Sequence, residues 1–142
     1  MKKLFLLYCL AALSVSGTLA QDIKAKDVPT VVKNALAKKY PSATKVSWEK
    51  EKGNYEANWG GKSSEDTSVQ FTPAGDFVEE VNAIVVSQLP PAVSDYIKAH
   101  YNDAKIKEAG RVTDAKGTKM FEAEIKGKDL IFDENGKFIK QD

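Results

Sequence analysis

Apolar residues recur every four positions in two separate stretches of the chain. The two series are Val28, Val32, Leu36 and Tyr40, and Leu89, Val93, Ile97 and Tyr101. A four-residue spacing places such side chains on one face of a helix. Pro41 ends the first helix, because the residue before a proline avoids the helical conformation. The pattern therefore predicts two amphipathic helices.

After each helix the apolar period changes from four to two, which is typical of strands with one buried face. The alternating stretches are 46–49, 55–59, 68–71, one that starts at Phe77, 105–113, 119–126, 129–132 and 137–140. Trp48 and Trp59 fall on the apolar positions of their strands, so we expect both to pack in the core. A tight turn at 52–54 joins two of these strands.

The second half of the chain repeats the first at an offset of 61 positions. Val28-Pro29 recurs as Leu89-Pro90, and Phe77 recurs as Phe138. This repeat predicts an α+β fold that arises by tandem duplication of one helix plus four antiparallel strands. Each helix has one apolar stripe and each hairpin has one apolar face. Both helices are therefore expected on one face of a continuous antiparallel sheet, with the other face open to solvent.

The first twenty residues have the order of a secretory signal peptide. Two lysines precede an apolar run over 4–15, and the small residues Thr18 and Ala20 follow it. This run is shorter than the roughly 20 residues that a membrane-spanning helix needs. We assign residues 1–20 to a signal peptide, 21–87 to the first repeat and 88–142 to the second. The predicted location after secretion is the periplasm.

Removal of the signal peptide changes the charge and the cysteine content. The segment holds two of the 21 Lys and Arg and none of the 20 Asp and Glu, so the formal charge moves from +1 to −1. It also holds the single cysteine, Cys9, which leaves no disulfide in the mature chain. A near-neutral chain without a basic amphipathic stretch is not typical of nucleic acid or membrane binding. We expect neither nucleic acid binding nor membrane insertion.

Short motifs occur at matching places in both halves. In the first half they are Val28-Pro29, Tyr40-Pro41-Ser42-Ala43, Val46-Ser47-Trp48-Glu49, Tyr55-Glu56-Ala57, Val69-Gln70-Phe71 and Ala74-Gly75-Asp76-Phe77. In the second half they are Leu89-Pro90, Tyr101, Ala104-Lys105-Ile106, Phe121-Glu122-Ala123-Glu124 and 129–138. Together they resemble the PepSY-like, beta-lactamase-inhibitor-like secreted proteins of Bacteroides and relatives. The resemblance implies tandem helix-plus-four-strand units, a shape like the inhibitor of beta-lactamase, and a cell-envelope location. It implies no established activity.

Catalytic groups are scarce in this sequence. A serine or cysteine nucleophile needs an adjacent base, usually histidine, and the only histidine is His100. It falls at the polar end of the second helix, where the helix dipole favours a solvated histidine. A zinc site needs three or four nitrogen or sulfur ligands, and His100 is the only such ligand after the first twenty residues. No glycine-rich loop has the spacing that binds nucleotides. We therefore predict no catalytic residue, no metal, no cofactor and no enzyme activity.

Carboxylates are the remaining candidates for chemistry. Glu122 and Glu124 lie two apart on one strand, and Glu56 is the first-repeat equivalent of Glu122. Paired carboxylates can hydrolyse glycosides. The solvent-exposed face of a strand also carries charged residues for solubility, and we expect that role here. The stretch 133–136 has the sequence Asp-Glu-Asn-Gly, which resembles the start of a calcium loop. At the equivalent place the first repeat has the glycine, Gly75, but not the acidic residues. We therefore expect a hairpin turn at 133–136.

The leading functional hypothesis is a secreted, non-enzymatic binding module of the cell envelope. It would inhibit or regulate another envelope protein through the open sheet face. The candidate surface consists of six residues on the solvent-exposed face of the strands: Glu49, Glu56, Asn58, Gln70, Glu122 and Glu124. The alternative is a periplasmic protein that binds a small ligand or a cation such as calcium through the outward carboxylates. Both hypotheses leave the partner and the oligomeric state open.

Overall fold

The computed structural model describes residues 20–62 and 65–142. The predicted signal peptide, except its last residue Ala20, lies outside the described residues and stays a prediction. In the part of the chain that the structure describes, no helix has the length and apolar character needed to span a membrane.

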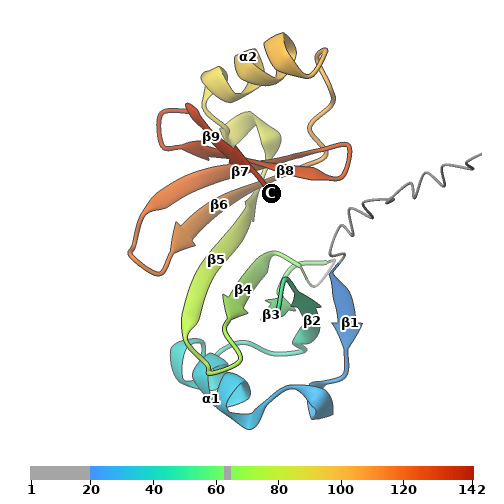
Figure 1. Cartoon of the computed structure of the whole chain (residues 1–142), viewed down its shortest axis with the longest axis vertical. Helices are drawn as coiled ribbons and strands as arrows, with labels where there is room; N and C mark the ends of the chain where they lie inside the picture. The colour runs from blue at the N-terminus through green and yellow to red at the C-terminus, as the bar shows by residue number, and fades with distance from the viewer. Residues whose placement is uncertain (1–19, 63–64) are drawn as a thin grey trace, which may run out of the picture.

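Two α-helices and nine strands make up the described chain (Figure 1). The helices are α1 (Thr30–Lys39) and α2 (Pro91–His100), and a short 3-10 turn precedes each: η1 (Ala25–Asp27) and η2 (Val86–Gln88). The strands are β1 (Gln21–Ile23), β2 (Ser47–Glu51), β3 (Asn54–Trp59), β4 (Thr67–Phe71), β5 (Phe77–Ile84), β6 (Glu108–Asp114), β7 (Lys119–Ile125), β8 (Lys128–Asp133) and β9 (Phe138–Gln141). Each strand pairs antiparallel with the next one in sequence, which gives a single sheet in the order β1 to β9. The predicted α+β fold with a continuous antiparallel sheet is confirmed.

Both helices pack on the same face of this sheet, as the sequence predicts. Val69 of β4 is buried in the core under α1, and it pairs with Glu80 of β5. Cross-strand partners point to the same face, so Glu80 also faces α1. Ile84 lies four residues further along β5, which puts it on the same face, and it packs against the core under α2. Figure 1 shows the two helices at opposite ends of the molecule.

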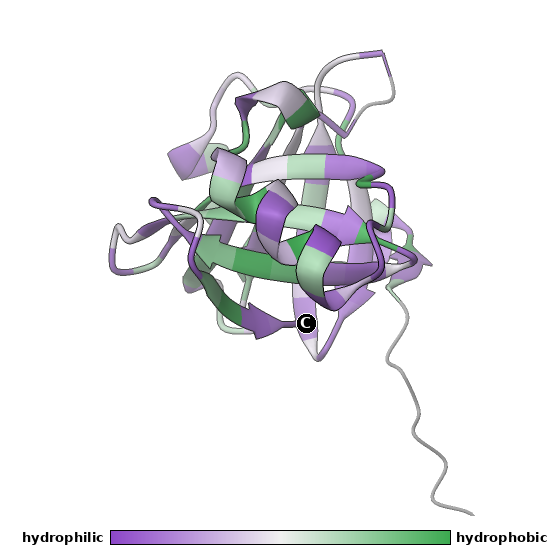
Figure 2. Ribbon diagram, turned by 90° about the horizontal axis from the view of Figure 1, so that it is seen from above, coloured by the Kyte–Doolittle hydropathy of each residue, from purple (hydrophilic) through white to green (hydrophobic). Residues whose placement is uncertain are grey.

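Each helix covers its own hydrophobic core. Val32 and Leu36 of α1 are buried in the first core. Their equivalents Val93 and Ile97 of α2 are buried in the second. Figure 2 views the molecule from the α2 end and shows hydrophobic strand segments beneath the helix. The four-residue stripes in the sequence therefore mark the buried faces of both helices.

Both tryptophans point toward α1, as the strand alternation predicts. Trp48 is buried with 5% of its surface exposed. Trp59 is partly buried against the same core, and its ring centroid lies 5.2 Å from that of Tyr40. Neither tryptophan is available as an anchor on the opposite sheet face.

The repeat extends further upstream than the sequence pattern indicates. At the offset of 61 positions, β1 and η1 match the last residues of β5 and η2. The register repeats as well, because Ile23 pairs with Trp48 and its equivalent Ile84 pairs with Ala109. Strand β5 thus completes the first repeat and opens the second without a flexible linker. The sequence does not predict β1, since three residues carry no periodic signal.

Equivalent glycines allow the last turn of each repeat to approach its helix. Gly75 has a φ of 87°, and Gly136 has a φ of 81°. A Cβ on Gly75 would lie 3.0 Å from the side chain of Val31 at the start of α1. A Cβ on Gly136 would lie 3.0 Å from that of Ala92 in α2. Both positions therefore need glycine for the left-handed backbone and for the close contact.

Candidate binding face

The sheet face opposite the helices is concave and rich in carboxylates. We name as the acid face a set of seven side chains that β2, β3, β5, β7 and β8 contribute: Glu49, Glu51, Glu56, Glu79, Glu122, Glu124 and Asp129. They line a hollow of about 310 Å³ together with polar and apolar groups such as Ser68, Gln70 and Val81.

The strand register explains why these side chains share one face. Glu49 pairs with Glu56, and Glu56 pairs with Gln70 of β4. Gln70 in turn pairs with Glu79 of β5. Because directly paired residues point to the same side of a sheet, these four form a row across the first repeat. The equivalent region of the second repeat contributes Glu122 and its neighbours on β7 and β8.

The curvature of the sheet brings the row of the first repeat toward Glu122 and its neighbours in the second repeat. Lys52, in the turn after β2, has its Nζ 4.0 Å from Oδ1 of Asp142 at the C-terminal end of the chain. Lys140 of β9 contacts the other oxygen of Asp142 at 2.6 Å. Figure 1 shows the C-terminus between the two ends of the molecule. Strands that are far apart in the sheet order therefore border the same hollow.

Glu122 has the most altered acidity on this face. Burial, followed by the nearby carboxylates of Asp129 and Glu79, raises the pKa of Glu122 from 4.5 to about 8. Its side chain is only partly exposed. Burial makes Glu122 less solvated than the strand alternation alone indicates. The alternation along a strand reports which face a residue occupies, but it does not report how far that face curves inward.

Several neighbours of Glu122 are shifted in the same direction. Burial is the largest cause in each case, and adjacent carboxylates add to it. The residues whose pKa is raised in this way are Glu49, Glu51, Glu79 and Asp129. Desolvation and repulsion both disfavour the ionised carboxylates. A positive charge that approaches this face therefore stabilises them.

Hydrogen bonds fix part of the first row. The Gln70 Nε2 donates to Glu56 Oε2 at 3.0 Å. The Ser68 hydroxyl donates to the side-chain oxygen of Asn58, which has only 3% of its surface exposed. Five of the six residues predicted from the sequence line the hollow: Glu49, Glu56, Gln70, Glu122 and Glu124. Asn58 shares their face, but little of its side chain is accessible.

The sequence interpretation missed three carboxylates of the acid face. Glu51 lies two residues after Glu49, so the strand period could have indicated it. Asp129 pairs with Glu124 across the tight turn that joins β7 and β8, which hairpin pairing could also have indicated. Glu79 could not be placed in this way. Its register with Gln70 depends on an irregularity between Gln70 and Phe71, a β-bulge that strand alternation does not reveal.

The hollow provides distributed negative charge. Among the described residues, no group of three or more His, Cys, Asp or Glu side chains is arranged to hold a metal ion. Of the described residues that line the hollow, Lys52 is the only cation. The carboxylates therefore form an extended electronegative surface.

Two other sequence candidates do not line this hollow. His100 is exposed, its Nδ1 lies 2.9 Å from the carbonyl oxygen of Tyr96, and its ring stacks on that of Tyr96. Asp133 Oδ1 accepts hydrogen bonds at 2.9 Å from the backbone N–H groups of Asn135 and Lys137. These bonds close the hairpin turn that the sequence predicts for residues 133–136.

Comparisons with known proteins agree with the fold. A family model described as "Putative beta-lactamase-inhibitor-like, PepSY-like" matches residues 18–77 and again residues 58–140. No curated protein matches the chain. A "putative periplasmic" protein of Bacteroides eggerthii is 23% identical, with a TM-score of 0.64 over 81% of this chain and 88% of that chain.

Two further solved structures share the architecture. A DUF2874 family protein of Bacteroides ovatus is 20% identical, with a TM-score of 0.62 over 80% of this chain and 86% of its own. A "BLIP-like protein" of Bacteroides fragilis is 22% identical, with a TM-score of 0.57 over 80% of this chain and 84% of its own. Because one family model matches the chain twice and spans more than half of it, this chain belongs to the PepSY-like, beta-lactamase-inhibitor-like family.

Proposed function

We propose that this protein is a non-enzymatic binding module of the cell envelope, and that its acid face holds a Lys- and Arg-rich segment of another envelope protein. The observation that carries this proposal is the composition of the hollow. Nine Asp and Glu side chains line it: the seven of the acid face, Glu108 and Asp142. Lys52 is the single cation among the described lining residues. A basic segment would supply the missing counter-charge.

The acidity of the lining residues supports a cationic partner. Carboxylates whose charged forms are disfavoured by burial gain more from an ammonium or guanidinium group than exposed carboxylates do, because screening by water is weaker. For Glu122, with a pKa of about 8, an arriving cation would also release a proton at neutral pH.

The shape of the acid face favours a polypeptide over a single ion. Its carboxylates extend from β2 to β8, and polar groups such as Ser68 and Gln70 lie among them. An extended segment can place basic side chains at several of these points and hydrogen-bond its backbone to the polar groups. Such distributed contacts provide specificity through charge complementarity.

The proposed location and role agree with the family. The predicted signal peptide would export the chain, and the similar Bacteroides eggerthii protein carries the description "putative periplasmic". The family description is inhibitor-like. We infer that the acid face acts by occupying a basic surface of its partner, which would inhibit or regulate that partner without breaking a bond.

Site-specific crosslinking in the native periplasm tests the proposal. A photoreactive amino acid at Gln70 lies in the hollow that the acid face lines, and one at Asn34 on the exposed side of α1 serves as the matched control. We expect a defined envelope protein to be crosslinked from Gln70 but not from Asn34, through a Lys- or Arg-rich peptide. The crosslink should be lost in Glu56→Gln/Glu122→Gln. Equal crosslinking from both positions, or crosslinking that survives these substitutions, would contradict the proposal.

The cation-binding alternative gives a different result. Calorimetry with calcium would then show heat that Glu124→Gln/Asp129→Asn abolishes, while no peptide is captured from Gln70. That combination would replace the proposed function with cation binding.

A further inference from the structure

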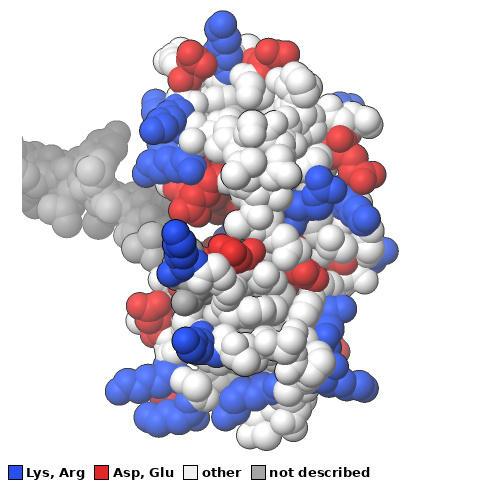
Figure 3. All heavy atoms as spheres, turned by 180° about the vertical axis from the view of Figure 1, so that it is seen from behind, with Lys and Arg blue, Asp and Glu red and all other residues white. Residues whose placement is uncertain are grey.

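Six lysines surround α1 at the end of the molecule away from α2. We name them the lysine end: Lys24, Lys26, Lys33, Lys38, Lys39 and Lys45. Five are exposed, and Lys33 is partly buried. Figure 3 shows basic side chains gathered over this end of the molecule, at the bottom of the view.

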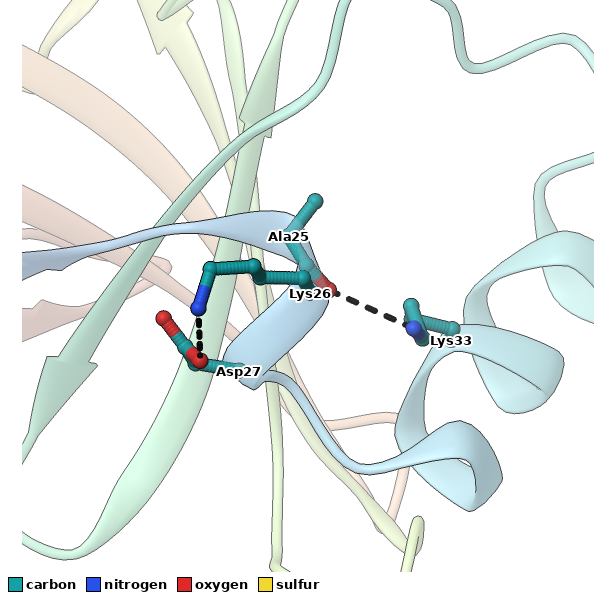
Figure 4. Close-up of polar contacts among 4 residues, drawn as sticks. All are labelled: Ala25, Lys26, Asp27 and Lys33. Atoms are coloured by element: carbon teal, nitrogen blue, oxygen red, sulfur yellow. Dashed lines mark hydrogen bonds and ion pairs between the residues drawn. The ribbon is translucent and has the colours of Figure 1, made fainter.

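Few acidic groups neutralise the lysine end. The Lys26 Nζ lies 3.0 Å from Asp27 Oδ1, and among the described residues this is the one ion pair that involves the set. The Lys33 Nζ donates to the backbone carbonyl of Ala25 at 3.3 Å, which leaves its charge uncompensated. Figure 4 shows both contacts: the ion pair lies within η1, and the Lys33 bond ties α1 to η1. Residues 21–46 contain six Lys and two Asp, a formal charge of +4.

The second repeat shows that the fold does not need these lysines. At the offset of 61 positions, the six equivalents are Val85, Ser87, Ser94, Ala99, His100 and Ile106. They occupy the same 3-10 turn, helix and following turn on the same scaffold. Residues 82–107 contain three Lys and two Asp, a formal charge of +1. The difference between the repeats therefore points to a use of the lysines that is separate from folding.

The arrangement of the lysines indicates the kind of partner. They come from η1 and the residue before it, from α1 and from the turn before β2, and Figure 3 shows basic side chains spread over this end of the molecule. A spread set of exposed cations fits an extended anionic surface, whereas a single small anion needs donors that converge on one point. Val31 is 48% exposed and lies seven residues before Lys38, so it shares that side of the helix and adds apolar contact area.

We propose that the lysine end is a docking surface for an anionic lipid bilayer, bound through its phosphate head groups without insertion. Lysines near such a surface contribute roughly additively, so the set needs no single dominant residue. The folded chain gathers lysines from three segments, so no single stretch of sequence reads as a basic amphipathic helix. The acid face lies on the opposite side of the sheet and would stay free while the lysine end is docked. This inference does not depend on the proposed function.

Vesicle co-sedimentation tests the proposal with the protein purified from the periplasm. The probes are vesicles of phosphatidylcholine with phosphatidylglycerol in equal parts and vesicles of phosphatidylcholine alone. The test variant is Lys26→Ser/Lys33→Ser/Lys38→Ala, which takes the residues that the second repeat carries at these positions. The control Lys98→Ala/Lys105→Thr/Lys119→Ser removes the same charge from the second repeat. Melting curves of all three proteins confirm that each is folded.

We expect the wild type to bind the anionic vesicles and not the neutral ones. The lysine-end variant should bind at least about tenfold more weakly, the control variant should change less than about threefold, and added salt should release the wild type. Three outcomes would overturn the proposal: no binding of the wild type to anionic vesicles, equal loss in both variants, or binding of soluble polyphosphate with no binding of vesicles.

Discussion

The Tyr40 hydroxyl donates a hydrogen bond of 2.6 Å to the carboxylate of Glu80, which ties the end of α1 to β5. Burial, together with the bond to Glu80, raises the pKa of the Tyr40 hydroxyl, so it stays protonated as the donor. The second repeat has an equivalent bond between Tyr101 and Gln141, which is longer, at 3.3 Å, and exposed. The two bonds form a matched pair that differs in charge and burial.

The Tyr40→Phe substitution is expected to lower the free energy of unfolding by about 1–3 kcal/mol. It removes a part-buried bond to a charged acceptor and leaves Glu80 with one donor fewer. The Tyr101→Phe substitution should cost about 0.5 kcal/mol or less, because its bond is exposed and neutral. Urea unfolding of both variants measures the difference. Equal costs for the two substitutions would contradict this account of the α1 contact.

The raised pKa of Glu122 predicts a stability that depends on pH. The folded protein holds this proton more tightly than the unfolded chain does, so the unfolding free energy falls as pH rises from about 4.5 to about 8. The expected loss between pH 5 and pH 8 is on the order of 1–3 kcal/mol from this group. The Glu122→Gln substitution should make the protein more stable at pH 8 and change little at pH 5.

The control for this prediction is Glu124→Gln on the same strand, which leaves Glu122 in place and should keep the fall in stability. Urea midpoints at both pH values provide the measurement. Part of the fall should persist in Glu122→Gln, because the pKa values of Glu49 and Asp129 are raised as well. A wild-type stability that rises between pH 5 and pH 8 would refute the assignment.

The glycine at the β4–β5 turn is expected to be harder to replace than the one at the β2–β3 turn. Gly75 and Gly53 have similar φ values of 87° and 85°. A Cβ on Gly75 would meet Val31 at 3.0 Å, whereas a Cβ on Gly53 would meet nothing within 4 Å. Gly53→Ala should cost about 1 kcal/mol from the backbone alone, and Gly75→Ala about 2–3 kcal/mol. Thermal melts that give equal costs would show that the close approach to α1 is unimportant.

Asn58 and Glu56 should separate stability from binding. Asn58 is almost fully buried and bonded to Ser68, so Asn58→Ala should lower the unfolding free energy by about 1–2 kcal/mol. Glu56 lines the hollow, so Glu56→Gln should weaken the binding of a basic peptide and leave stability nearly unchanged. Paired unfolding and binding curves check both effects. A loss of binding in a folded Asn58→Ala protein, with none in Glu56→Gln, would reverse these roles.

Much of the fold was predictable because its determinants are local. The four-residue stripe of Val32 and Leu36 recurs as Val93 and Ile97, and both pairs are buried under their helices. Two-residue alternation likewise placed Trp48 in the first core. A duplicated sequence gave each of these patterns two independent occurrences. Helix and strand periods are therefore reliable here, since each element is amphipathic.

The site was less predictable because it depends on collective geometry. Alternation correctly put Glu56 and Glu122 on the face away from the helices, yet only the curvature of nine strands draws these residues toward one hollow. Glu79 reaches that face through a bulge, which has no signature in the apolar pattern. The acidity of Glu122 likewise arises from residues of both repeats, which no single stretch of sequence contains.

The most direct test of the acid face is an NMR titration of the folded protein with a peptide of alternating lysine and alanine. The account predicts amide shifts along β3, β4 and β7 around Glu56, Gln70 and Glu122, with α1 and α2 unmoved. Affinity should fall about tenfold in Glu56→Gln/Glu122→Gln and should also fall as salt is added. Shifts spread over both sheet faces, or an affinity that the two substitutions leave unchanged, would contradict the central claim.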